Sequence, residues 1–197
     1  MSRIFVTSDT HFGHENIIRY ASRPFADWRA MGEGIVERWN SRVDEDDVVY
    51  FLGDFAMGPG ATEEYIVSIL NRLHGFKYML LGNHDLPSKY SDGLSNLIER
   101  HDFQFYATIL HEQIRHLDVD GKTFVMCHYP MSDWHGKQTF DPKGSIHLHG
   151  HTHTTFSSVD CNEFIAQKCY DIGVDMYGGP VQITGDLRYL NDPRGWA

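Results

Sequence analysis

Five short, largely apolar segments are the feature of this 197-residue chain that most constrains its fold. They span residues 4–8, 48–53, 78–82, 124–127 and 146–150, and each is followed at once by Asp, Asn or His. Their length and composition are typical of strands that are buried on both faces of a sheet. Helical patterns lie between several of these strands, and this order predicts an α/β fold.

Apolar residues recur at helical spacing in two of the intervening segments. Residues 62–73 carry such a stripe behind Thr62, which is placed to cap the helix. Residues 28–43 carry a second stripe behind Asp27. A third helix is expected within residues 88–100. The sequence therefore places helices outside the predicted sheet.

The predicted strands pair in both senses. The strand–helix–strand order of residues 48–81 predicts a parallel pair. Residues 113–119 and 122–127, joined by Asp120 and Gly121, predict an antiparallel hairpin. No repeat or linker divides the chain, so we expect mixed sheets within a single domain that spans residues 1–197.

Composition and charge exclude several classes of protein. The formal net charge of −10 argues against a protein that holds long nucleic acid on a basic face. No apolar run approaches the roughly 18 residues that a membrane span needs, and the N-terminal apolar run is too short for a signal sequence. The three cysteines have no CxxC spacing, which fits a reducing compartment. We therefore expect a cytoplasmic protein that contacts no membrane, and the sequence leaves the oligomeric state open.

Side chains that can bind metal ions follow the five strands. In an open α/β sheet, such groups gather at the carboxyl ends of the strands. The potential ligands are Asp9, His11, Asp54, Asn83, His128, His151 and His153, with His84 beside them. Carboxylate, amide and imidazole donors without thiolate suit Mn, Fe or Zn, and Mg or Ca less well. Seven ligands exceed the four of a tetrahedral zinc site and suit two ions that share a carboxylate.

The same residues carry a family resemblance. The strings Asp9-Thr10-His11, Gly53-Asp54, Gly82-Asn83-His84-Asp85, Cys127-His128 and Gly150-His151-Thr152-His153 occur in the order and approximate spacing of the calcineurin-like metallophosphoesterase superfamily. Residues 8–25 resemble the small predicted phosphoesterases of bacteria and their phages. The resemblance covers residues 3 to about 176, without departure at the metal-binding positions. It implies a four-layer α-β-β-α sandwich of two mixed sheets flanked by helices.

The resemblance also implies a role for each of these residues. Asp9, His11 and His153 would hold one ion, Asn83, His128 and His151 a second, and Asp54 would bridge the two. The ions would be divalent, with Mn²⁺ the first expectation and Fe, Zn, Ni or Mg the alternatives. A hydroxide that bridges the ions would attack phosphorus, and His84 would protonate the leaving group.

Further residues have weaker assignments. His14, Asn16 and Arg23 could meet a substrate phosphate, or serve only the local loop and helix cap. The loop of residues 134–143 could form a substrate rim or be an ordinary exposed loop. Gly53, Gly82 and Gly150 are expected to allow tight turns through the φ angles that glycine tolerates. Residues 182–197 are predicted to be weakly structured and available to a partner.

The expected function is hydrolysis of a small phosphodiester or phosphomonoester, with a diester and a nucleotide-type substrate favoured. Phosphoprotein phosphatases carry Asp and Arg where this chain has Met57 and Gly58, so a protein substrate is disfavoured. A nuclease that acts on short oligonucleotides on the same site is an alternative. An alternative of another class is a non-catalytic protein-interaction module, like the retromer subunit that shares this fold but has lost metal-site histidines.

Overall fold

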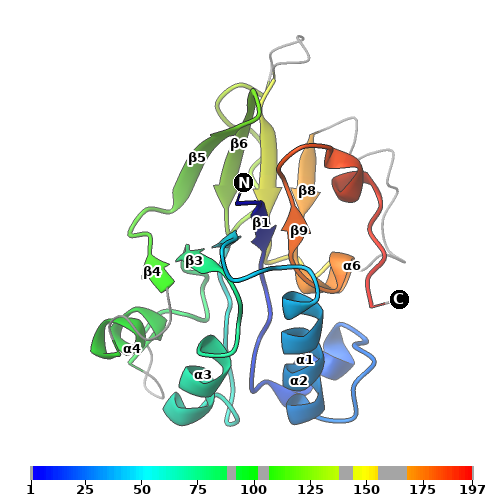
Figure 1. Ribbon diagram of the computed structural model, residues 1–197. Helices are drawn as coiled ribbons and strands as arrows, with labels where there is room; N and C mark the ends of the chain where they lie inside the picture. The colour runs from blue at the N-terminus through cyan, green and yellow to red at the C-terminus, as the bar shows by residue number, and fades with distance from the viewer. Residues whose placement is uncertain (1, 88–91, 102–106, 138–143, 155–167, 197) are drawn as a thin grey trace.

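A five-stranded sheet forms the first half of the structure, a computed structural model that describes residues 2–87, 92–101, 107–137, 144–154 and 168–196 (Figure 1). The strand order is β4-β3-β2-β1-β9. Four strands run parallel: β1 (Ile4–Thr7), β2 (Val48–Phe51), β3 (Phe76–Met79) and β4 (Ala107–Ile109). The short strand β9 (Val181–Gln182) pairs antiparallel with β1.

The second sheet has four strands in the order β5-β6-β7-β8. Strands β5 (Ile114–Val119) and β6 (Lys122–Cys127) form the expected antiparallel hairpin. Asp120 and Gly121 at its turn both have positive φ, of 50° and 74°, which is typical of a two-residue hairpin loop. Strands β7 (Ile146–His149) and β8 (Cys169–Asp171) continue the sheet in parallel. Both sheets are therefore mixed.

Four helices cover the outer face of the first sheet: α1 (Glu15–Tyr20), α2 (Trp28–Asn40), α3 (Glu63–Leu70) and α4 (Leu94–Arg100). The predicted caps are present, because Asp27 accepts a hydrogen bond from the N–H of Ala30 and Thr62 one from the N–H of Tyr65. The third predicted helix is α4, and residues 88–91 of that prediction lie outside the described residues.

Two apolar cores fix the position of the sheets. Alternate residues of β1 point to opposite faces, so that Phe5 packs under the helices and Val6 packs between the sheets. The core between the sheets joins Val6 and Leu52 to Phe124 and Leu148 of the second sheet. The α/β fold with two mixed sheets flanked by helices is confirmed. Within the described ranges, no helix has the length and apolarity that crossing a bilayer requires.

The C-terminal segment is ordered through residue 196, and the prediction that residues 182–197 are weakly structured is wrong for residues 182–196, while residue 197 lies outside the described residues. A short helix, α6 (Val174–Tyr177), strand β9 and a 3₁₀ helix, η2 (Leu187–Asn191), follow the second sheet. Ile183 and Leu190 are buried in the core between the sheets. Trp196 packs edge-on against Phe25, and its carbonyl accepts a hydrogen bond from Arg38. Contacts with distant parts of the chain hold this segment in place. The sequence therefore did not reveal that the segment is ordered, because it carries no helix or strand pattern of its own.

Candidate metal centre

The carboxyl ends of the two sheets meet at one edge. A parallel bridge joins Ser8, directly after β1, to Gly173, which follows β8. The N–H of Asp9 bonds to the carbonyl of Gly53, and the N–H of Gly150 bonds to the carbonyl of His128. These bonds draw the ends of β1, β2, β6 and β7 together. The predicted ligand side chains therefore collect at this edge.

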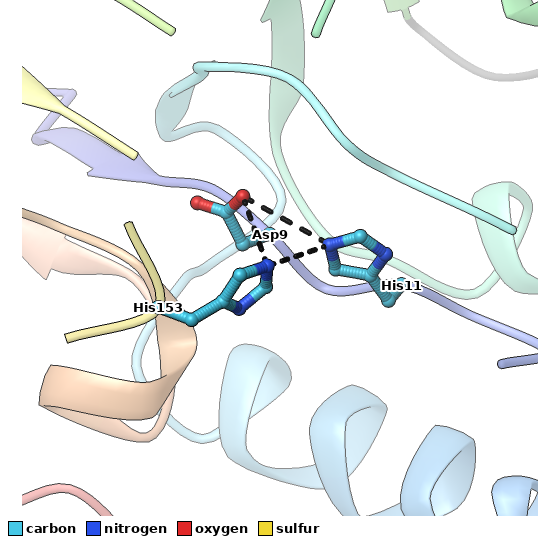
Figure 2. A group of neighbouring side chains, drawn as sticks. All are labelled: Asp9, His11 and His153. Atoms are coloured by element: carbon cyan, nitrogen blue, oxygen red, sulfur yellow. Dashed lines mark hydrogen bonds and ion pairs between the residues drawn. The ribbon is translucent and has the colours of Figure 1, made fainter. Parts of the chain in front are cut away.

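One group of three side chains consists of Asp9, His11 and His153 (Figure 2). Their ligand atoms point toward one another. The Nε2 atoms of His11 and His153 are 3.1 Å apart. Oδ1 of Asp9 lies 4.0 Å from Nε2 of His11 and 3.9 Å from Nε2 of His153. One carboxylate oxygen and two imidazole nitrogens at these separations suit a single transition-metal ion.

A second group consists of Asp54, His128 and His151, whose ligand atoms all lie within 4.8 Å of one another. Asn83 adjoins this group, since its Oδ1 lies 3.1 Å from Nε2 of His128. The structure therefore brings together all of the predicted ligands, three in the first group and four in the second.

Asp54 links the two groups. Its Oδ2 atom lies 3.6 Å from Nε2 of His11 and 3.6 Å from Nε2 of His128. This oxygen is buried and has no hydrogen-bond partner among the described residues. A buried carboxylate oxygen without a partner is costly unless a cation or a donor satisfies it. The donor set and the unsatisfied oxygen fit divalent cations on both sides of Asp54.

Hydrogen bonds from the far ring nitrogens orient two of the histidines. The Nδ1 atom of His128 lies 2.8 Å from the carbonyl oxygen of Leu52, and Nδ1 of His153 lies 2.9 Å from Oδ2 of Asp175. We assign the proton of each ring to Nδ1, because a carbonyl and a carboxylate only accept hydrogen bonds. Both Nε2 atoms are then free to bind metal, as is common for metal-binding histidines.

Arg23 has a different position from the one predicted. Its side chain is fully buried and makes a two-pronged ion pair with Asp175, at 2.7 and 2.9 Å. It also donates to the backbone carbonyls of Asp9 and Thr10. The prediction that Arg23 contacts substrate is wrong, because all of its donor groups are engaged inside the protein. Arg23 instead fixes Asp175, which in turn orients His153.

Burial and neighbouring charges shift the ionisation of the first group. Burial raises the pKa of Asp9 to about 8, and it holds the pKa of His11 well below its ordinary value. Burial also opposes protonation of His153, but the hydrogen bond to Asp175 and the charge of Asp9 outweigh it and raise this pKa. A cation would stabilise the charged carboxylate of Asp9 and thereby offset its burial.

The backbone is strained where it carries the ligands. Asp9, His11, Asp54, His151 and His153 all have positive φ, between 48° and 69°. This left-handed region costs about 1 kcal/mol or more for residues other than glycine. Such strain persists where the surrounding contacts impose it, and it is concentrated in proteins at functional sites.

The glycines beside the ligands are required for two different reasons. Gly53 has a φ of +99°, as the sequence predicts. Gly82 and Gly150 have no positive φ, and for them the predicted reason is wrong. A Cβ on Gly82 would collide with Oδ1 of Asp54, and one on Gly150 would collide with Oδ2 of Asp9. These two glycines are needed because the ligand carboxylates pass directly over their backbones.

The carboxylate of Asp85 holds the backbone beside the second group. Asp85 was not predicted from the sequence as a site residue. Its buried carboxylate accepts hydrogen bonds from the backbone N–H groups of Asp54, Phe55 and Gly82, at 2.6, 2.9 and 2.9 Å. Burial raises its pKa to about 7. Asp85 ties the turn after β2 to the turn after β3, and its place within the Gly82-Asn83-His84-Asp85 string was the available signal.

Three further residues lie near the ligand groups. His84 is partly exposed, with its Nε2 4.0 Å from Oδ2 of Asp54, and its backbone N–H donates to Oδ1 of the same carboxylate. The ring of His14 lies 5.7 Å from that of His11. Tyr129, which the sequence did not indicate, places an exposed ring 4.8 Å from those of His128 and His151.

Two predicted substrate elements stand apart from this cluster. Asn16 is exposed on α1, and no hydrogen bond among the described residues joins its side chain to the ligand groups. In the predicted rim, Trp134 is buried against His147, while residues 138–143 lie outside the described residues. His147 is itself held between Val125 and Met131, as expected of a packed residue of the sheet.

Two mixed sheets with histidine and carboxylate groups at their shared edge define a metal-binding α/β protein. The sequence model of the calcineurin-like phosphoesterase superfamily domain matches residues 2–166, and the chain belongs to this superfamily. The family implies a metal-dependent hydrolase of phosphoric esters.

Relatives of similar length are found in a phage and in an archaeon. The chain is 32% identical over 204 residues to the Gene 66 protein of Mycobacterium phage D29, with 98% of each chain covered. It is 31% identical over 176 residues to the uncharacterized protein MJ1445 of Methanocaldococcus jannaschii, covering 89% of this chain and 82% of the relative. The crystal structure of the protein AQ665 from Aquifex aeolicus is similar with a TM-score of 0.64 at 22% identity, covering 92% and 96% of the two chains. This likeness supports the fold alone.

Proposed function

We propose that this protein is a phosphoesterase with a binuclear metal centre. The observation that carries the proposal is the position of Asp54, whose unpartnered Oδ2 lies between histidines of both ligand groups. Asp9, His11 and His153 would hold one ion, Asn83, His128 and His151 would hold the other, and Asp54 would bind both. Manganese suits this mixture of oxygen and nitrogen donors.

When bound, two divalent ions polarise phosphoryl oxygens and lower the pKa of a bound water. The side chains hold this site in a fixed shape, because hydrogen bonds to Leu52 and Asp175 set the rings of His128 and His153. Buried Arg23 and Asp85 fix the turns that carry the ligands. Little reorganisation is then needed as negative charge develops on the phosphoryl group.

His84 supplies a proton. It lies beside Asp54, is partly exposed, and belongs to neither three-residue ligand group. Hydrolysis breaks a P–O bond and adds the oxygen of water to phosphorus, so the alcohol oxygen must gain a proton. Protonated His84 can give this proton from Nε2 to the leaving oxygen.

The substrate is a small phosphate ester, with a phosphodiester of nucleotide type favoured. Even with two divalent ions bound, a chain with a formal charge of −10 stays negative overall. This repels long polyanions and tolerates a single phosphate held at the centre. The cytoplasmic location that the sequence predicts is compatible with such a substrate.

The test is an assay of the purified, Mn-loaded protein with bis(p-nitrophenyl) phosphate, p-nitrophenyl phosphate and 2′,3′-cyclic nucleotides. We expect hydrolysis of a diester, its loss on chelation, and recovery with Mn²⁺ more readily than with Ca²⁺. Turnover of the monoester alone would correct the substrate class. The absence of metal-dependent turnover of every ester would refute the proposed function.

A further inference from the structure

A cavity of about 800 Å³ adjoins the metal centre on the side of His84. Asn83 and His84 form its inner wall, and Ile66 of α3 and Leu94 and Leu97 of α4 lie on the wall toward the helices. The two helices lie beside one another (Figure 1), and an ion pair of 2.8 Å between Arg100 and Glu63 joins them. The size is that of a site for a small organic molecule. We call it the α3–α4 cavity.

The lining of the α3–α4 cavity is largely apolar and almost uncharged. Among the described residues that line it, only His84 and Asp85 have ionisable side chains. The carboxylate of Asp85 already accepts three backbone hydrogen bonds and is buried. No lysine or arginine of the described lining is available to a second phosphate. The cavity therefore matches an uncharged group with much apolar surface.

We propose that the α3–α4 cavity binds the alcohol that leaves the phosphate ester, and that this alcohol is uncharged and carries an aromatic ring, as an aryl alcohol or a nucleoside does. The inference rests on the proposed hydrolysis and adds the class of leaving alcohol that the enzyme prefers. The position of His84 determines which part of the ester occupies the α3–α4 cavity. The atom that His84 protonates is the leaving oxygen, so the group attached to that oxygen must extend to the side on which His84 lies. That side is the cavity.

The kinetic test compares two diesters, methyl phenyl phosphate and methyl 2-naphthyl phosphate, which differ in the leaving aryl group. We expect the wild type to prefer the naphthyl ester by about tenfold in kcat/KM, because the second ring removes further apolar surface from water. Lengthening the retained methyl group to butyl is expected to leave kcat/KM nearly unchanged, since that group lies outside the cavity. If the enzyme hydrolyses only monoesters, phenyl and 2-naphthyl phosphate replace the diesters.

Two matched variants locate the effect. Ala61 lines the cavity and is partly buried, so Ala61→Leu adds three carbons within it. Ala30 is exposed on α2 and is absent from the lining, so Ala30→Leu adds the same three carbons elsewhere. We expect Ala61→Leu to abolish the preference for the naphthyl ester, because it lowers kcat/KM for the naphthyl ester about tenfold more than for the phenyl ester. Ala30→Leu should behave as the wild type does.

A binding measurement separates this inference from the proposed function, because it requires no turnover. Titration calorimetry of the full chain with 2-naphthol should give binding that Ala61→Leu weakens about tenfold or more and that Ala30→Leu leaves unchanged. This result supports the cavity as the alcohol site even if every ester assay fails, in which case only the hydrolysis is refuted. Equal turnover of both esters, or naphthol binding that is absent or insensitive to Ala61→Leu, overturns the inference.

Discussion

Removing the imidazole of His84 should remove a proton donor, whereas removing the imidazole of a ligand histidine should remove a metal ligand. The backbone N–H of His84 holds Oδ1 of Asp54, and this bond survives in His84→Ala. We therefore expect His84→Ala to lower kcat by about 10² to 10⁴ while metal content is retained, as for the loss of a general acid. The exposed His111 provides the control, and His111→Ala should keep full activity. Loss of metal from His84→Ala would show that His84 is a ligand and that its assignment is wrong.

Asp175 is a positioning residue, because it acts on the metal centre through the ring of His153. Burial alone would raise its pKa, but the charge of Arg23 and the hydrogen bonds from His153 and Arg23 together outweigh this and hold the pKa of Asp175 below its ordinary value. Asp175→Asn weakens the hold on the ring of His153. We expect a loss of about 10-fold to 100-fold in affinity for one metal ion. Calorimetric titration with Mn²⁺ checks this, and unchanged affinity for both ions would contradict the role.

At the scale of elements, the turns that follow the strands determine the site. Gly150 separates β7 from His151, and a methyl group there would collide with the carboxylate of Asp9. We expect Gly150→Ala to lower the free energy of unfolding by about 1–3 kcal/mol through overpacking, and to weaken metal binding. Denaturant unfolding and metal titration measure the two effects.

Gly121 provides the matched control for this substitution. It lies at the turn of the hairpin with a φ of +74°, and no atom lies within 4 Å of the position that an added methyl group would take. Gly121→Ala therefore incurs only backbone strain, about 1 kcal/mol, and should leave metal affinity intact. If the two variants weaken metal binding equally, close packing against Asp9 is not the reason for glycine at position 150.

The sequence predicted the elements whose signal is local. The strands before Asp9 and Asp54 are apolar runs with a polar end, and the caps Asp27 and Thr62 act within their own helices. Strands β8 and β9 have three and two residues, too few to show a period. They are held by pairing with β7 and β1. Because the sequence did not indicate β8, it also gave no signal for Asp175, which follows that strand.

The sequence predicted the metal ligands of the site but not the residues that position them. The ligand residues occur in recognisable strings along the chain. Arg23 was predicted to meet a substrate phosphate because it follows Asp9 and His11 closely in the sequence, but its ion pair with Asp175 joins residues far apart in the sequence. Such pairing depends on the tertiary fold, and a single sequence gives no measure of it.

At the scale of the whole molecule, one buried lysine makes stability depend on pH. Lys77 of β3 is buried with its ammonium against the carbonyls of Leu73 and Gly75, and burial lowers its pKa to about 8. Between about pH 8 and the ordinary pKa of 10.5, the native state loses a proton that the unfolded chain keeps. The unfolded state then binds more protons, so the free energy of unfolding rises with pH over this range.

The comparison with Lys77→Met isolates this contribution from other groups that titrate at alkaline pH. We expect the stability of the wild type to gain up to about 3 kcal/mol on the variant between pH 8 and 10.5. Urea unfolding at a series of pH values measures the difference. Parallel stability curves for the two proteins would show that Lys77 keeps its ordinary pKa in the native state.

The number of metal ions bound per folded chain tests the central claim most directly. Equilibrium dialysis of the full chain against Mn²⁺, followed by elemental analysis, should reach about two ions per chain at saturation. Asp54→Ala should weaken both, because its Oδ2 lies between the two ligand groups. Saturation at one ion, or no binding by a protein that circular dichroism shows to be folded, would contradict the binuclear centre.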